Sequence, residues 1–510
     1  MSNKSTKGIW KVISASSVGT LIEWYDFYIF GSLAVVISTK FFPSDNPTAA
    51  FLSTLATFAA GFVVRPFGAL FFGRLGDLIG RKYTFMVTLL LMGGATFLIG
   101  CIPSYETIGF LAPLLVLLLR LLQGLALGGE YGGAATYVAE HAPKGQRGFW
   151  TSWIQTTATA GLFVSLIVIL ITKGLLSKEQ FEEWGWRVPF WVSILMVLVS
   201  YIIRKGMHES PLFAKAKSEG KTSTNPLKES FGHKYNLKFV LLALFGATMG
   251  QGVVWYTGQF YAMSYLKTVM SVDATQVDGL MGIALLMATP FFVFFGWLSD
   301  KVGRKAVMMS GMLIAIVCYR PIYNSMYKTT DLSLKTEVSS KMEATFKTLE
   351  GTKSDSIYTT NKAFADGTTS EEIKTVHLDN GVRIKDDAGK DKVETKLTKT
   401  ITSSDRWWII LMVFIQVFFV TMVYGPIAAF LVEMFPVRIR YTSMSLPYHV
   451  GNGIFGGLLP AISTYLVTTG KDAGDPEFYL EGLWYPIGIA AVCFVIGMIY
   501  LDKKISTLHD

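Results

Sequence analysis

Twelve apolar runs dominate this chain of 510 residues. Each is about 20 residues long, the length that a helix needs to cross the hydrocarbon core of a bilayer. Inside lipid every backbone polar group must be satisfied within its own segment, which a helix achieves. The runs therefore predict an all-α membrane protein with twelve transmembrane helices. Their centres lie near residues 25, 60, 92, 120, 160, 197, 248, 286, 314, 420, 456 and 492.

The net charge of +9 could indicate a nucleic-acid partner, but the basic residues lie in short clusters between the apolar runs. That distribution favours the lipid bilayer as partner and excludes nucleic acid. Cys101, Cys318 and Cys493 lack metal-ligand spacing, and no catalytic triad or phosphate loop is present. We expect neither an enzyme nor a bound cofactor or metal. The first run reaches Glu23 and Asp26 without a cleavage site, so we expect this helix to be retained.

An even number of spans places both chain ends on one side of the membrane. Short cytoplasmic loops carry excess Lys and Arg. With the N-terminus inside, the cytoplasmic segments hold 23 of the 46 basic residues and the short outer loops hold 6. Another 14 lie in residues 324–406, and Arg65, Arg120 and Arg320 lie within apolar runs. We expect a monomeric, multi-pass protein of the bacterial inner membrane with both termini cytoplasmic.

The chain repeats itself. GRLGDLIGRK at 73–82 returns as GWLSDKVGRK at 296–305, and EHAPKGQR at 140–147 returns as EMFPVRIR at 433–440. The offset grows from 223 to 293, so 70 extra residues enter between the ninth and tenth spans. This pattern predicts two pseudo-symmetric six-helix bundles. Their ranges are 1–204 and 238–510, with a cytoplasmic linker at 205–237 and an extracytoplasmic insertion at 324–406.

The insertion loses the apolar runs and contains 14 basic and 14 acidic residues. Long outer loops largely escape the charge rule, so its lysines do not contradict the orientation. Around Asn380 and Gly381, apolar residues alternate on both sides of an Asn-Gly turn signal. A small β-rich outer lobe and a mobile linker are both compatible with this composition.

The repeated loops suggest a gate. Asp77 and Asp300 could each dock against a helix N-terminus of the other half, where the helix dipole favours an anion. The competing interpretation is that the basic residues of these loops only set the membrane topology, a role that does not need the aspartates. Glycine permits the tight turn. The gating candidates are Gly73, Asp77, Gly80, Arg81, Glu140, Arg147, Asp300, Gly303, Arg304, Glu433 and Arg440.

The two copies of this loop resemble the signature of the major facilitator superfamily, over the whole chain except 324–406. The resemblance implies two six-helix halves that rock around a site near the bilayer midplane. Within the superfamily, the chain resembles the metabolite:H⁺ symporter family, which implies symport of organic acids or zwitterionic osmolytes with protons. The matching segments are 23–27, 65–68, 120–124, 128–130 and 251–256.

Charged residues inside the apolar runs point to the same chemistry. Burying one at the bilayer centre costs about 2.5–3.5 kcal/mol, so it faces a cavity or a partner. Glu23 and Asp26 share one helix face, and depth places them near Arg65 and Arg120. A substrate anion that captures Arg120 would release Asp26 to take a proton; a structural ion pair is the alternative. Gln123 and Glu130 complete this set, and Glu130 could serve a gate or a second proton site.

The remaining substrate candidates are polar and aromatic. Aromatic faces can hold a quaternary ammonium and amides can bind a carboxylate, although such residues also join helices to each other. His449 is an alternative proton carrier. The candidates are Tyr25, Gln251, Trp255, Tyr256, Gln259, Tyr424, His449 and Asn452.

Together these features predict a secondary active transporter. We expect proton-coupled symport of a small-molecule substrate by alternating access, with protons as the coupling ion. The substrate would be a small organic anion or zwitterion: a mono-, di- or tricarboxylate, a shikimate-like acid, or proline or betaine. Proton-linked efflux is the transport alternative. A receptor that senses a ligand through the outer insertion belongs to another class.

Overall fold

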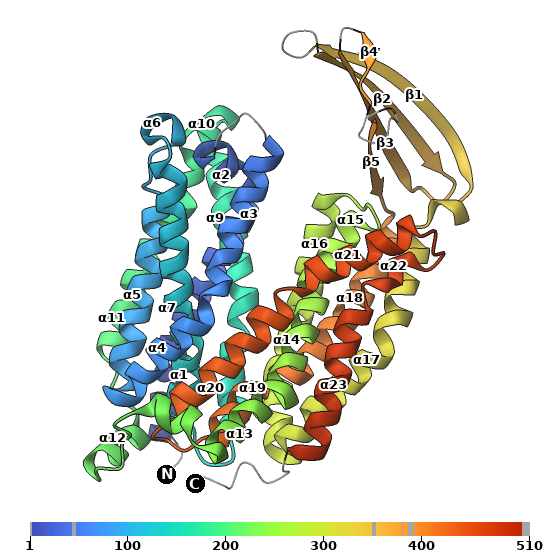
Figure 1. Cartoon of the computed structure of the whole chain (residues 1–510). Coiled ribbons are helices and arrows are strands. Elements are labelled where there is room, and N and C mark those ends of the chain that lie inside the picture. Colours follow the sequence, from blue (N-terminus) through green and yellow to red (C-terminus); the bar gives the residue numbers. More distant parts are fainter. Residues whose placement is uncertain are drawn as a thin grey trace.

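Two helical bundles stand side by side in the computed structural model of the chain, and a β-sheet projects from one of them (Figure 1). The bundles converge at the end where the chain begins and ends, here called the termini face (Figure 1). The opposite end, which carries the sheet, is called the lobe face. The structure describes residues 3–42, 47–348, 353–379, 381–385, 391 and 393–501.

The N-terminal bundle contains the first six predicted spans. α1 bends by 68° into α2. Pro66 lies in the first turn of α4, where its missing N–H is not needed, and the second span is interrupted at Val64. The elements are α1 (Asn3–Ser32), α2 (Ala34–Phe41), α3 (Pro47–Val63), α4 (Arg65–Leu78), α5 (Arg81–Ile99), α6 (Tyr105–Ile108), α7 (Leu111–His141), α8 (Arg147–Gln155), α9 (Thr157–Leu175), α10 (Lys178–Glu183), the 3₁₀ turn η1 (Gly185–Arg187) and α11 (Val188–Lys205).

The C-terminal bundle contains the other six. Two of its spans include π-helical turns, which often mark functional sites. The elements are α13 (Lys234–Ala243), η3 (Leu244–Thr248), α14 (Met249–Tyr256), η4 (Thr257–Tyr261), α15 (Ala262–Thr268), α16 (Ala274–Val302), α17 (Arg304–Thr329), α18 (Ser403–Tyr424), α19 (Ile427–Met434), α20 (Arg440–Val450), η6 (Gly451–Gly456), α21 (Leu459–Asp472), α22 (Phe478–Glu481) and α23 (Trp484–Tyr500).

The segment between the bundles is partly helical. It contains α12 (Pro211–Ser218), which the Ser210 hydroxyl caps by accepting from the Phe213 amide, and the π-helical η2 (Lys228–Gly232). α13 already begins at Lys234. The predicted linker at 205–237 therefore overlaps the last residue of α11 and the first turn of α13.

The helices agree with the predicted membrane fold. Within the described ranges, ten helices are long and apolar enough to cross a bilayer, and the bent α1–α2 pair makes up to eleven. The interrupted α3 and α4 occupy the position of the predicted second span. Each of the twelve predicted runs thus has a helical counterpart.

Close helix approach gives the N-terminal bundle its shape. α7 packs against α4 and α5, and a Cβ added at Gly128 would collide with the Arg65 carbonyl. A Cβ at Gly124 would likewise collide with the Gly61 carbonyl of α3. Such small-residue contacts let backbones pack closely in lipid, where apolar burial contributes little to association. This packing holds Arg65 and Arg120 on adjacent helices.

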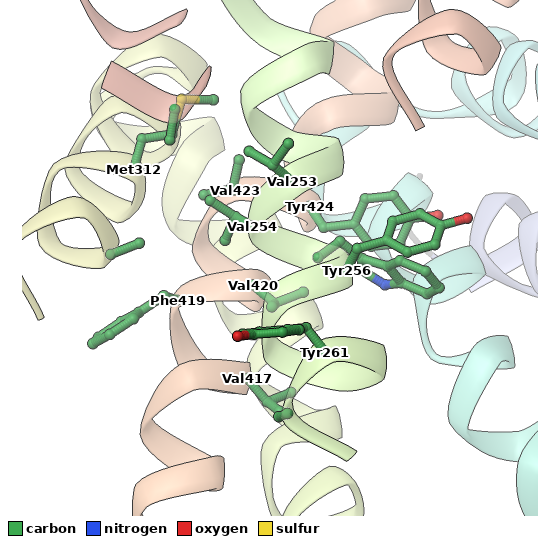
Figure 2. Packing of buried hydrophobic residues seen from close by; sticks show 14 of the residues in the cluster. Val253, Val254, Tyr256, Tyr261, Met312, Val417, Phe419, Val420, Val423 and Tyr424 are labelled. Carbon is green, nitrogen blue, oxygen red and sulfur yellow. The ribbon is translucent and has the colours of Figure 1, made fainter. Parts of the chain in front are cut away.

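The largest apolar cluster lies in the C-terminal bundle. Val253 and Val254 of α14 pack with Val420 of α18 and Met312 of α17 (Figure 2). In the same view Tyr256 and Tyr424 project the other way, toward the pale blue ribbons of the N-terminal half. α14 therefore uses one face for the bundle core and turns another to the interface between the halves.

The sheet lies within the predicted insertion. Its strands are antiparallel, in the order β1-β2-β3-β4, with β5 also paired to β3. The hairpin from Asp379 to Val382 encloses the predicted Asn-Gly turn, of which Asn380 lies outside the described residues. The strands are β1 (Glu337–Thr348), β2 (Lys353–Phe364), β3 (Thr369–Asp379), β4 (Val382–Arg383) and β5 (Val393–Thr400), and a 3₁₀ turn, η5 (Leu332–Leu334), precedes them.

Of the two alternatives for the insertion, the structure contains the β-rich lobe. The predicted all-α fold therefore holds for the membrane part of the chain, whereas the insertion forms a β-sheet. The lobe is also shorter than 324–406, since α17 continues to Thr329 and α18 begins at Ser403. Figure 1 shows the lobe on the face opposite the termini.

Main-chain bonds fix the lobe to the C-terminal bundle. The Lys399 amide donates to the Ser271 carbonyl at 2.7 Å, and the Asp273 amide donates to the Lys399 carbonyl at 2.9 Å. The Gln276 side chain bonds both the amide and the carbonyl of Ile401, at 2.9 and 3.1 Å. These bonds join the end of β5 to the α15–α16 turn in the way that main-chain bonds join two neighbouring strands.

Candidate functional site

The structure brings Asp26 of α1 and Arg120 of α7 together. An Arg120 guanidinium nitrogen lies 2.7 Å from Asp26 Oδ2, and the two residues are 4% and 2% exposed. Gln123, one turn beyond Arg120, donates to Asp26 Oδ1 at 2.9 Å and to the Thr96 hydroxyl at 2.6 Å. The Arg120 guanidinium also lies over the Phe30 ring, 3.6 Å from its centroid. Both Asp26 oxygens therefore accept hydrogen bonds in a buried network.

A second carboxylate–arginine pair lies on the same wall. Arg65 of α4 donates to Glu23 Oε1 at 3.2 Å, and its guanidinium lies 4.3 Å from the centre of the Phe62 ring. Sequence reasoning paired these two residues by depth alone. Each of the two pairs joins a carboxyl group to a guanidinium, so the pocket wall combines two acidic and two basic side chains.

Two adjoining cavities expose these groups. Asp26, Arg120 and Gln123 line a cavity of about 260 Å³. Glu23 lines a second cavity of about 390 Å³. Arg65 and Phe62 line both, so the smaller cavity, which lies within the N-terminal half, adjoins the larger one between the halves.

The C-terminal half contributes the opposite wall of the larger cavity. Five predicted candidates are found there: Trp255, Tyr256, Tyr424, His449 and Asn452.

Three aromatic residues in this region were missed by sequence reasoning: Trp24, Tyr131 and Tyr448. Trp24 and Tyr448 line the cavity. Tyr448 stacks on Tyr131 with ring centroids 3.7 Å apart, and its hydroxyl is 2.7 Å from that of Tyr424. A tyrosine in an apolar run does not reveal which face it occupies, so the sequence offered no way to find these contacts.

Aromatic rings also connect the two halves beside the cavity. Trp24 of α1 meets Trp255 of α14 with ring centroids 5.0 Å apart, and Phe27 meets Phe260 at the same distance. The Phe27–Phe260 contact lies farther toward the lobe face than Glu23 and Tyr256 do.

Four predicted site residues lie elsewhere or are already paired. Tyr25 points into its own bundle and donates to the Pro189 carbonyl at 2.5 Å. Gln251 and Asn452 bond each other through both amide groups, at 3.0 and 3.1 Å. Gln259 is buried in η4 and lies outside the described linings of both cavities.

Glu130 belongs to a separate buried cluster. Arg204 of α11 donates to Glu130 Oε1 at 2.5 Å, and both side chains are fully buried. Thr88 donates to the other oxygen at 2.8 Å, and the Arg204 guanidinium lies over the Phe85 ring. Arg204 lies at the cytoplasmic end of the sixth apolar run, where a basic residue is common, so nothing in the sequence indicates its pairing with Glu130.

The termini face is closed by two matching contacts between the halves. Asp77 at the end of α4 accepts from the amides of Tyr441 and Thr442, at 3.3 and 2.8 Å, in the first turn of α20. Asp300 at the end of α16 accepts from the amides of Gly148 and Phe149, at 2.9 and 2.8 Å, in the first turn of α8. In each case an anion meets the N-terminus of a helix in the opposite half.

Arginines complete each contact. Arg81 lies 3.1 Å from Asp77 and 3.5 Å from Glu140. Arg440 donates to Glu140 across the interface at 3.1 Å.

The second half repeats the arrangement. Arg304 lies 2.6 Å from Asp300 and donates to both oxygens of Glu433, at 3.0 and 3.2 Å. Arg147 opens α8 beside the Asp300 contact.

Three predicted glycines allow the turns and the close approach. Gly80 and Gly303 have φ of 130° and 98°, which a side chain would strain. A Cβ at Gly73 would come within 2.9 Å of the Thr442 backbone, so α4 and α20 could not pack as they do.

Comparison with known proteins agrees with this architecture. A family model described as "Sugar (and other) transporter" matches residues 11–344, more than half of the chain. This chain belongs to that family. The transporter is 29% identical over 505 residues to an alpha-ketoglutarate permease of Escherichia coli, covering 99% of this chain and 96% of that protein. It is 28% identical to a citrate-proton symporter of Salmonella typhi, covering 98% and 96%.

A further relative is more similar over a shorter region. An inner membrane metabolite transport protein of Escherichia coli is 38% identical over 328 residues, which cover 62% of the transporter and 73% of that protein. Among solved structures, the proton:xylose symporter XylE superposes with a TM-score of 0.70 at 14% identity, covering 98% and 97% of the two chains. The fold is that of the major facilitator superfamily, and the chain is a multi-pass membrane transporter, not an enzyme.

Proposed function

We propose that this transporter carries a small organic anion or zwitterion together with protons by alternating access. The observation that carries the proposal is the Asp26–Arg120 pair, which lines a cavity of the N-terminal half next to the cavity between the two halves. The names of its relatives support the same substrate range. They include an alpha-ketoglutarate permease, a citrate-proton symporter and a proline/betaine transporter of Salmonella typhimurium, 34% identical over 322 residues.

The proposed coupling follows from the contacts of Asp26. A carboxylate bound to a guanidinium stays ionised, whereas one left alone in a dry cavity takes up a proton. A substrate carboxylate that binds Arg120 would compete with Asp26 for the same donors. Asp26 would then accept a proton as the substrate binds and lose it when the substrate leaves. Gln123, which bonds both residues, would keep Asp26 and Arg120 in contact.

The contacts at the termini face would close and open one side of the transporter. With Asp77 and Asp300 docked, that face is closed. When both docks release, the halves can rock about the central site and open it. We place the protein, as a monomer, in a bacterial inner membrane with the termini face cytoplasmic, because the segments on that face hold 23 basic residues and the short loops on the other face hold 6.

Reconstituted protein tests the proposal. Purified transporter is first screened by thermal shift with 2-oxoglutarate, citrate, shikimate, proline and glycine betaine, since binding stabilises the folded state. A stabilising compound is then supplied to proteoliposomes with an inward proton gradient. We expect accumulation that collapses on addition of a protonophore. Accumulation that does not depend on the proton gradient, or export driven by that gradient, would contradict symport.

A receptor function is tested by removing the lobe. A variant that joins Thr330 to Thr402 through a short Gly-Ser linker deletes the strands but keeps both flanking helices. The proposal expects uptake to survive in this variant when its insertion matches that of the intact protein. Ligand binding that disappears with the lobe would instead favour a sensor.

A further inference from the structure

One aromatic side chain of the C-terminal half is buried against helices of the N-terminal half. Tyr441 belongs to the first turn of α20 and is 0% exposed. Its hydroxyl donates to the Gly129 carbonyl of α7. α20 packs against both α4 and α7 (Figure 1). The Tyr441 side chain thus crosses the plane along which the two halves separate when the termini face opens.

Glycines surround this ring. A Cβ added at Gly76 of α4 would lie 2.1 Å from one edge of the Tyr441 ring. A Cβ at Gly132 of α7 would lie 2.9 Å from the opposite edge, and one at Gly133 would lie 2.6 Å from the hydroxyl oxygen. These three glycines are here called the glycine socket. Because the ring has neighbours at both edges and at its tip, a side chain added in the socket would compete with it for the same space.

The matching contact of the other half is built without a large side chain. The repeat offset of 293 places Gly148 of α8 at the position equivalent to Tyr441. A Cβ at Gly148 would lie 2.4 Å from the Gly296 carbonyl and 2.7 Å from the Ser299 hydroxyl of α16. There the helices approach through glycine on both sides, so the crossing itself does not require a tyrosine.

Opening the termini face withdraws the Tyr441 ring from its socket. The ring then loses its contacts, and the glycines supply no side chain that could fill the space it leaves. A ring that fits the socket therefore favours the closed face. A ring that is too small, or a socket that is too narrow, favours the open face.

We propose that Tyr441 is a plug whose fit in the glycine socket holds the termini face closed. The inference rests on the alternating access of the proposed function and adds to it a closing contact that works through shape. Asp77 closes the same face through charge, and it uses the backbone amide of Tyr441 rather than the ring. Side-chain substitutions at Tyr441 can therefore separate the two contacts.

Spin labels on purified full-length protein measure the closed and open populations. The labels are attached to cysteines at Tyr83 and Val302, exposed positions on opposite halves, in a background without native cysteines. Gly76→Ala should raise the ratio of long to short distances about tenfold, because its Cβ would overlap the ring. Gly94→Ala of α5 is the matched control and should leave the ratio unchanged, since no described atom lies within 4 Å of its added Cβ.

A double variant tests the fit itself. Tyr441→Ala removes the plug and should raise the ratio by itself. Tyr441→Phe keeps the ring and loses the bond to Gly129, so the ratio should change by no more than about fivefold. In the Tyr441→Ala background, Gly76→Ala should cause no further rise, because the ring that it would overlap is gone.

Two results would overturn the plug. One is an equal effect of Gly76→Ala in the wild-type and Tyr441→Ala backgrounds, and the other is an unaltered ratio in Tyr441→Ala, which decides the matter even if Gly76→Ala protein does not insert. Because these distances are measured without substrate, proton-driven uptake by the wild type together with either result would refute this inference alone. Wild-type protein that shows the expected distances but no gradient-driven uptake would refute the proposed symport and leave the plug standing.

Discussion

Asp77→Asn should open the termini face. Asp77 is fully buried and accepts from the Thr442 amide at 2.8 Å, the Thr442 hydroxyl at 2.7 Å and the Tyr441 amide at 3.3 Å. It also lies 3.1 Å from Arg81. Asparagine keeps one acceptor oxygen and no charge, so at least one charge-assisted bond and the ion pair are lost. If the closed state loses about 3 kcal/mol of stabilisation, the ratio of open to closed protein rises roughly a hundredfold.

Spin labels can measure that change. Cysteines are placed at Tyr83 and Val302, exposed positions on opposite halves near the termini face, in a background without native cysteines. Distances from pulsed electron resonance should be mostly short in the parent protein and mostly long in Asp77→Asn. Asp278→Asn, at an exposed residue paired with Lys267, is the matched control and should leave the distances unchanged. An unaltered distribution in Asp77→Asn would refute the docking argument.

Two further predictions concern other parts of the chain. Glu130→Gln should lower the thermal midpoint, since it leaves Arg204 buried without its anion, but should leave the pH profile of uptake in place; a shifted profile would instead assign Glu130 to proton coupling. In the lobe, burial lowers the pKa of Lys335, but its bonds to Asp366 and Asp405 outweigh this and raise it; burial raises the pKa of Asp366, but bonds from Lys335 and Thr368 outweigh this and lower it from 3.8. The stabilisation from Asp366 is therefore present above pH 3.8 and lost as pH falls through its lower folded pKa, and that from Lys335 is present below pH 10.5 and lost as pH rises through its higher folded pKa. Protease resistance of the lobe should thus be level between these limits and fall in strong acid. Lys335→Met should remove this pH dependence, and a dependence that persists in the variant would contradict the prediction.

Helix positions and the two gate contacts could be predicted because duplication reveals them. The same spacing occurs twice, so Asp77 and Asp300 could be assigned to equivalent turns, and an anion at the end of a span has few partners other than a helix N-terminus. The pairs at Glu23 and Asp26 were predictable for a related reason: a charge inside an apolar run needs a counter-charge at the same depth, and only Arg65 and Arg120 were available there.

The rest of the site depends on which way side chains face. Gln251 and Asn452 lie on different helices, and nothing in either segment shows that their amides would satisfy each other. Tyr25 lies between two site residues yet points into its own bundle. Helix packing decides these directions, through small contacts that a single sequence does not display.

The lobe shows a similar limit. Its hairpin was visible as an Asn-Gly turn between alternating residues, but the union of β5 with the α15–α16 turn joins residues more than a hundred positions apart. Backbone bonds of this kind have no residue signature, because any sequence can make them.

The most direct test of the account is Asp26→Asn in proteoliposomes. The variant should insert normally and still exchange labelled for unlabelled substrate across the membrane, because Arg120 remains to bind an anion. It should fail to accumulate substrate against its gradient when protons flow inward, because asparagine cannot take up the proton. Proton-driven accumulation at the wild-type level in correctly inserted Asp26→Asn protein would contradict the central claim.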